Sequence, residues 1–129
     1  MTTPTPVRTV IRRAGLAAVG GTVGTAARLG LGMLIADAPV AVLVANIAGA
    51  MLLGILTARL PASDLRILLG TGMLGGFTTY SAFALDSVEL WADSPARAVG
   101  YVVASVGGGL VSAWLGLRIG GSFRVGRAS

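Results

Sequence analysis

The sequence predicts an all-α membrane protein with four transmembrane helices, the third of which is broken. Hydrophobic residues make up 54% of the chain and charged residues only 12%, whereas soluble proteins carry about 25% charged residues. The uncharged stretches run for roughly 20 residues, which matches a hydrocarbon core of about 30 Å at a rise of 1.5 Å per residue. We expect a single domain over residues 1–129, with helices at about 14–36, 39–58, 65–90 and 97–119.

The charged residues and the missing residue types limit the function. All ten basic residues are arginine, the net charge is +5, and the arginines stand at the ends of the apolar segments. Such flanking arginines anchor helices to anionic lipid headgroups, so the partner they indicate is membrane lipid and not nucleic acid. Because the chain has no cysteine and no histidine, it lacks the usual metal ligands, thiol chemistry and a histidine base. We therefore predict that it is not an enzyme.

The first two predicted helices differ in character. Segment 14–36 is rich in small residues and contains the pair Gly20 and Gly24, which allows close approach of another helix. Asp37 and Pro39 are expected to end it and to begin the next helix. Segment 39–58 has one strongly polar side chain, Asn46, near its centre. An amide in hydrocarbon must find a partner, so Asn46 faces either another helix or water.

The third segment does not have the sequence of a continuous helix. Pro61, Ser63 and Asp64 supply turn and N-cap chemistry before it. Glycines at 70, 72, 75 and 76 are then followed by a run of hydroxyl residues over 78–81. Paired glycines make helix continuation costly, and the hydroxyls can satisfy the freed backbone groups. Broken backbone at membrane depth is tolerated where it is buried in protein or lines an aqueous path, so the break indicates an ion or solute pathway.

Several residues have a plain structural interpretation. The aromatic side chains at 77, 80 and 83 recur every third residue, a stripe that usually serves helix packing. The last helix contains Ser105 and the triplet 107–109 and is expected to pack closely against a neighbour. Asp86, three residues after Phe83, is expected to be a solvated charge near a helix end.

Residues 75–83 read GGFTTYSAF. This string is similar to the signature GG-x-TTFSTF of the Fluc (CrcB) family of fluoride channels. Residues 21–28 read GTVGTAAR and resemble its G-xx-GA-xx-R motif, and residues 44–49 read VANIAG and resemble VN-xx-G. The resemblance covers roughly residues 14–120, and the motif in the third segment is specific.

The resemblance implies an antiparallel dimer with two narrow fluoride pores, in which fluoride leaves the cell down its own gradient. It also implies a structural sodium ion at the dimer centre, held by the main-chain carbonyls of Gly75 and Thr78 of each subunit. Dual topology, a location in the plasma (inner) membrane and fluoride resistance follow from the same family.

Mapped onto this chain, the family's pore residues begin with Asn46, whose amide N–H would contact fluoride. Tyr80 and Phe83 occupy the two phenylalanine positions that line the pores, and Thr79, Ser81 and Ser105 supply hydroxyl contacts. Fluoride is small and strongly hydrated, so its water must be replaced by hydrogen-bond donors or by the positive edge of an aromatic ring. Two residues depart from the pattern, namely Tyr80 in place of phenylalanine and Ala82 in place of threonine. Arg28 is assigned a structural role, because a fixed charge deep in a narrow pore would trap the anion.

Two other functions compete with this interpretation. A small multidrug or cation exporter of the four-helix, dual-topology type also forms antiparallel dimers, but it needs a carboxylate inside the membrane. The five acidic residues all lie at or near segment ends in the predicted arrangement. A noncatalytic membrane assembly subunit would explain the small residues but not the break in the third segment.

The arginines also predict the topology. With four spans, and leaving out Arg28 inside the first one, one side of the membrane carries eight arginines and the other carries one, Arg97. The eight are Arg8, Arg12, Arg13, Arg59, Arg66, Arg118, Arg124 and Arg127. The positive-inside rule therefore predicts cytoplasmic termini. A chain that inserts both ways should have balanced charges. We therefore expect this chain to insert mainly one way and to form its antiparallel dimer with a related subunit of opposite charge bias; a dimer with a second, inverted copy of itself is the alternative.

Overall fold

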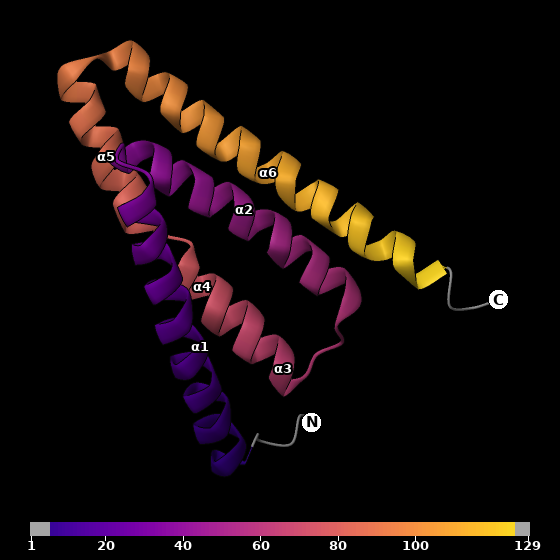
Figure 1. The fold of residues 1–129 in the computed structure, drawn as a ribbon. Helices are drawn as coiled ribbons and strands as arrows, with labels where there is room; N and C mark the ends of the chain where they lie inside the picture. The colour runs from indigo at the N-terminus through magenta and orange to yellow at the C-terminus, as the bar shows by residue number, and fades with distance from the viewer. Residues whose placement is uncertain (1–5, 126–129) are drawn as a thin grey trace.

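The computed structural model describes residues 6–125, with side chains through residue 122, and this part of the chain is helical with no strand. Figure 1 shows α1 crossing the molecule beside the short helices α3 and α4, while α2 and α6 run side by side. The start of α1 and the loop between α2 and α3 lie near one end of the molecule, and the turn between α5 and α6 lies at the other (Figure 1). The elements are α1 (Val7–Leu34), α2 (Ala38–Arg59), α3 (Asp64–Arg66), the π-helix η1 (Ile67–Leu74), α4 (Gly75–Phe77), α5 (Tyr80–Asp93) and α6 (Pro95–Val125).

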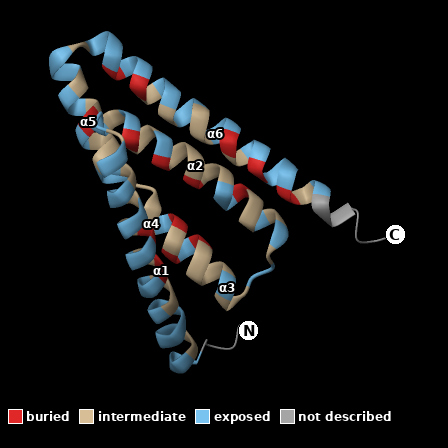
Figure 2. Cartoon of the chain, viewed as in Figure 1, coloured by how far each residue is buried: buried red, intermediate tan, exposed pale blue. Residues whose placement is uncertain are grey.

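The distribution of apolar side chains is that of a protein surrounded by apolar material. The buried hydrophobic residues are few and mostly small, and no large side chain in the described region is fully buried. Large apolar residues such as Met33, Val103 and Leu110 are more than half exposed, and Figure 2 shows exposed residues along the outer faces of α1 and α6. Exposure of so much apolar surface to water would be unfavourable, whereas lipid or a second subunit would cover it.

Two of the described helices are long and apolar enough to cross a membrane, Ala38–Arg59 and Pro95–Ser122. The helix α1 contains Arg28 and many glycine and threonine residues, and residues 64–93 are divided among several short elements. For these two regions, spanning of the membrane stays a prediction.

The helix α1 lies against the backbone of η1 and α4. Gly20 and Gly24 are the buried residues of α1, and a Cβ atom on either would overlap backbone atoms of Leu68 or Met73. Because these two positions of α1 have no side chain, the glycine-rich segment can approach α1 closely. This confirms the packing role predicted for the Gly20 and Gly24 pair.

The second close contact joins α2 to α6. A Cβ atom on Gly54 would overlap the carbonyl oxygen of Ala113, and one on Gly116 would overlap that of Met51. Within the predicted triplet at 107–109, only Gly108 approaches a neighbour, the side chain of Ile47. The α2–α6 contact therefore depends more on Gly54 and Gly116 than on the triplet.

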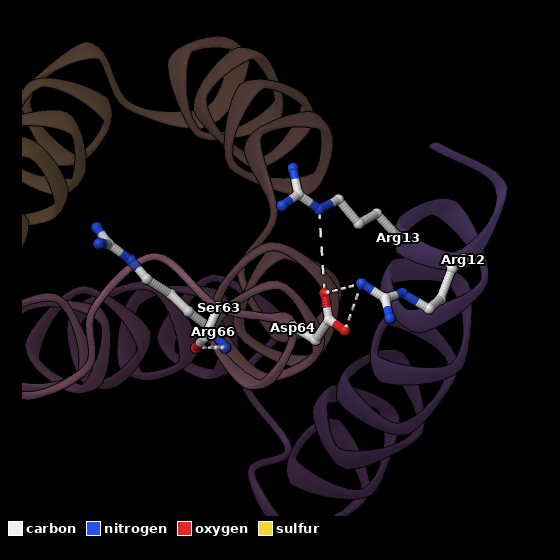
Figure 3. A network of polar contacts seen from close by, with 5 residues as sticks. All are labelled: Arg12, Arg13, Ser63, Asp64 and Arg66. Atoms are coloured by element: carbon white, nitrogen blue, oxygen red, sulfur yellow. Dashed lines mark hydrogen bonds and ion pairs between the residues drawn. The ribbon is translucent and has the colours of Figure 1, made fainter. Parts of the chain in front are cut away.

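Polar side chains begin the helices where the sequence predicted them. The Asp37 carboxylate accepts from the Val40 backbone N–H at 3.1 Å at the start of α2. The Ser63 hydroxyl accepts from the Arg66 N–H at 3.3 Å at the start of α3. The Asp64 carboxylate also forms ion pairs with the guanidinium groups of Arg12, at 3.0 Å, and Arg13, at 4.0 Å. Figure 3 shows these contacts. These ion pairs join the first turns of α1 to the α2–α3 loop.

The helix bounds extend beyond the predicted spans at both ends of the chain. The first helix begins at Val7 where we expected about residue 14, and the last continues to Val125 where we expected about residue 119. Hydropathy marks where an apolar stretch begins, whereas arginine is a good helix former and does not end a helix. The arginine-rich flanks therefore continue the helices.

Candidate functional site

The chain leaves the helical conformation between α4 and α5. Thr78 (φ −80°, ψ 157°) and Thr79 (φ −150°, ψ 127°) are both extended. The Thr78 hydroxyl donates to the Leu74 carbonyl oxygen at 2.9 Å, and the Thr79 hydroxyl accepts from the Ala82 N–H at 3.3 Å as the N-cap of α5. Each threonine thus satisfies a backbone group on its own side of the interruption.

The side chain of Asn46 on α2 binds the backbone of this extended segment. Its Oδ1 accepts from the Thr79 N–H at 2.8 Å, and its Nδ2 donates to the Thr79 carbonyl oxygen at 2.9 Å. Both backbone polar groups of one extended residue are therefore satisfied by a single amide. Because a primary amide has two N–H donors, one donor of Asn46 stays available. The two predicted roles of Asn46, interhelical bond and donor to an ion, are thus compatible in one side chain.

Gly49, one turn after Asn46 on α2, makes room for the interruption. A Cβ atom on Gly49 would overlap the methyl group of Thr78. The extended segment can therefore lie directly against α2 only because residue 49 has no side chain.

A cavity of about 480 Å³ lies along this segment and gathers most of the predicted site residues. It contains every predicted pore or carbonyl residue except Ser81, whose hydroxyl lies 3.2 Å from that of Thr79. The Ser105 hydroxyl is buried and makes no hydrogen bond within the described region. The lining consists of Asn46, Gly49, Ala50, Leu53, Gly70, Leu74, Gly75, Thr78, Thr79, Tyr80, Phe83, Ser105 and Val106.

The aromatic side chains form a connected series beside the cavity. The ring centroids of Tyr80 and Phe83 lie 6.0 Å apart, and those of Phe83 and Tyr101 lie 5.6 Å apart, with tilted rings in both cases. Tyr80 is 80% exposed in the single chain, whereas Tyr101 is buried. Tyr101 is not among the residues predicted from the sequence, although it lies four residues before Ser105 and therefore on the same face of α6.

The expectation that Asp86 is a solvated charge is wrong. Its side chain is buried, and its Oδ2 accepts from the Tyr101 hydroxyl at 3.1 Å. Its position three residues after Phe83 places it on the face of α5 that packs against α6. Asp86 is not among the residues that line the cavity.

Arg28 lies against the glycine pair that precedes the interruption. Its Nε donates to the Gly76 carbonyl oxygen at 3.4 Å, and the Thr25 hydroxyl lies at the same distance from that oxygen. Arg28 does not line the cavity.

No hydrogen bond reaches the Thr78 carbonyl oxygen within the described region, and both Gly75 and Thr78 line the cavity. Uncharged backbone oxygens of this kind suit a hard monovalent cation such as sodium. The Thr78 carbonyl therefore fits one of the two predicted ligands, and Gly75 lines the same cavity.

An apolar helical chain with a donor-lined cavity at a backbone interruption has the features of a membrane channel or transporter. The sequence pattern of the family described as CrcB-like protein, Camphor Resistance (CrcB), matches residues 15–117. The chain belongs to this family. Its curated relatives are ion channels and not enzymes, which confirms both the resemblance found in the sequence and the prediction that the chain is not an enzyme.

Several relatives cover most of the chain. The protein named fluoride-specific ion channel FluC 2 of Rhodococcus jostii (strain RHA1) is 44% identical over 108 residues, which are 81% of this chain and 95% of that protein. The fluoride-specific ion channel FluC of Paracoccus denitrificans (strain Pd 1222) is 45% identical over 111 residues, 80% of this chain and 90% of its own. FluC 2 of Bacillus subtilis (strain 168) is 40% identical over 108 residues, 79% of this chain and 82% of its own.

Proposed function

We propose that the chain forms a fluoride-selective channel that exports fluoride passively across the plasma membrane and so lowers cytoplasmic fluoride. The observation that carries the proposal is the 480 Å³ cavity, where hydrogen-bond donors and aromatic rings meet at the backbone interruption. The relatives named as fluoride-specific ion channels support the choice of ion.

The available groups suit an anion that must exchange its hydration shell for protein contacts. The second N–H of Asn46 and the hydroxyl of Ser105 are donors without an acceptor in the described region. The ring edge of Phe83 carries the positive end of the aromatic quadrupole. Fluoride accepts strong hydrogen bonds, so these groups would replace its water, with Thr79, Ser81 and Tyr80 as further contacts.

We further propose that residues 64–93 cross the membrane once as a single interrupted span, which gives four spans with α1, α2 and α6. The two carbonyls of Gly75 and Thr78 would then lie at membrane depth, and a second, antiparallel subunit would supply two more. A sodium ion held by these carbonyls would supply positive charge that stabilises the facing extended segments. Fluoride flux that survives complete replacement of sodium by a bulky organic cation would contradict this part of the proposal.

The exporter alternative gains no support from the buried carboxylate. A cation exporter needs an acidic group that faces its substrate path, whereas Asp86 is bonded to Tyr101 and lies outside the cavity lining. The channel is therefore the function that the site supports best.

Liposome flux tests the proposal directly. Purified protein in potassium-loaded vesicles should release fluoride but little chloride when a potassium ionophore supplies the counter-current. Equal release of the two halides would contradict a selective channel, and a requirement for a proton gradient would contradict passive export.

A further inference from the structure

A second polar cavity adjoins the proposed pathway. It measures about 320 Å³, lies between α2 and the α3–η1 segment, and is lined by Leu53, Thr57, Arg66, Gly70 and Thr71. Leu53 and Gly70 also line the larger cavity. The two cavities therefore share this pair of lining residues.

The polar side chains of this second cavity are all donors without an acceptor. Three other arginines are in ion pairs: Arg12 and Arg13 contact Asp64, and Arg97 contacts Asp93. No described residue pairs with the Arg66 guanidinium, which in Figure 3 is directed away from Asp64. The hydrogen bond drawn to Arg66 in that view joins its backbone N–H to the Ser63 hydroxyl and does not involve the guanidinium.

The hydroxyls of the two threonines in this cavity also lack an acceptor within the described residues. Thr22 and Thr78 donate to the carbonyl one helical turn earlier, as threonine in apolar helices commonly does. Within the described part of the chain, the hydroxyls of Thr57 and Thr71 make no such bond, and both residues are exposed. No acidic side chain lines the cavity. A half-buried guanidinium and two exposed hydroxyls face this cavity from α2 and from the α3–η1 segment. All three can donate hydrogen bonds to water or to an anion.

From this arrangement we propose that Arg66, Thr57 and Thr71 form an anion-binding mouth of the pathway, a deepening that rests on the proposed channel function. The ligand is a small hard anion, either free fluoride or the phosphate of a lipid headgroup. The mouth lies beside the α2–α3 loop, and the positive charge there raises the local anion concentration without entering the narrow part of the path. Arg66 is thus a recruiting residue and not a pore residue.

The test compares fluoride flux of the purified, reconstituted protein with Arg66→Gln at several fluoride concentrations and ionic strengths. At low salt and limiting fluoride, Arg66→Gln should reduce flux about threefold or more, because one unit charge at close range changes local anion concentration by about that factor. High salt or saturating fluoride should remove the difference. Arg66→Lys should retain most of the flux.

Arg12→Gln is the matched control, because Arg12 lies near the same loop but is paired with Asp64 outside the cavity. It should leave flux unchanged. A difference for Arg66→Gln in vesicles of purely zwitterionic lipid identifies free fluoride as the ligand, whereas a difference seen only after phosphatidylglycerol is added identifies the headgroup phosphate.

Three results would overturn the anion-binding mouth: wild-type flux with Arg66→Gln in both lipids, an equal effect of Arg12→Gln, or a loss that persists at high salt and saturating fluoride. If the wild-type protein itself releases no fluoride, the proposed channel function fails. That outcome is distinct from an active wild type with an unaffected variant, which overturns the mouth alone.

Discussion

At the scale of single residues, Asn46 has two tasks that one substitution can separate. Asn46→Asp keeps an acceptor for the Thr79 N–H but loses the donor to the Thr79 carbonyl and the second donor left for an ion. Because the carboxylate also repels an anion, fluoride flux should fall at least about tenfold, the effect of losing a hydrogen bond to a charged group. The measurement is flux in liposomes, with Thr22→Val, which removes a hydroxyl bonded only to Ala18, as the control.

Size-exclusion chromatography would show whether the Asn46→Asp protein is still folded. Normal flux in a folded Asn46→Asp protein would mean that Asn46 only joins α2 to the interruption and does not contact the ion.

Tyr80 is the second residue whose role a substitution can decide. Its ring lies 6.0 Å from that of Phe83, and its side chain is 80% exposed, so its hydroxyl has no fixed partner among the described residues. If this hydroxyl narrows the path or traps the ion, Tyr80→Phe should raise fluoride flux, and if it donates to fluoride, flux should fall. A rate equal to wild type would show that Tyr80 does not contact the ion in the rate-limiting state.

At the scale of the elements, the fit between α2 and the extended segment predicts a rescue experiment. Gly49→Ala would place a methyl group against the methyl of Thr78, and such overpacking costs about 1–3 kcal/mol. Both the thermal stability in detergent and the fluoride flux should therefore fall. Thr78→Ser removes the opposing methyl but keeps the hydroxyl that donates to Leu74, so the double variant should recover both properties.

The control for this pair is Gly15→Ala, which adds a methyl group where nothing lies within 4 Å. It should leave flux unchanged and should not lower the stability. If Thr78→Ser fails to rescue Gly49→Ala, the contact between residues 49 and 78 does not determine the position of the interruption.

The elements also show which features the sequence could predict. Asp37 and Ser63 begin helices where their types and positions indicated, because a cap depends on neighbours two or three residues away. Residues 78 and 79 are extended next to the glycine pair, whereas a break inside a transmembrane helix stays a prediction.

Contacts between distant segments were harder to predict. The burial of Asp86 against Tyr101 depends on which face of α5 turns toward α6, and neither segment reveals this alone. The two hydrogen bonds between the Asn46 amide and the Thr79 backbone likewise require the packing of α2 against a segment 33 residues later in the chain.

At the scale of the whole molecule, the large exposed apolar surface leaves room for a second subunit, and the arginine distribution predicts how that subunit is oriented. In the four-span arrangement that we propose, the side with the termini and the α2–α3 loop carries eight arginines. The opposite side carries Arg97, which is itself paired with Asp93, and Arg28 lies within the first span. By the positive-inside rule we expect cytoplasmic termini and insertion mainly in one direction.

An antiparallel homodimer requires equal insertion in both directions, so we propose that the natural partner is a related subunit with the opposite charge bias. Reporter fusions at the C-terminus measure this directly in the native membrane. One-sided insertion, with no fluoride flux from the chain expressed alone and flux restored by the partner, is the expected result. Equal populations of the two orientations would instead establish the homodimer, because each orientation would then supply half of a complete pair of pores.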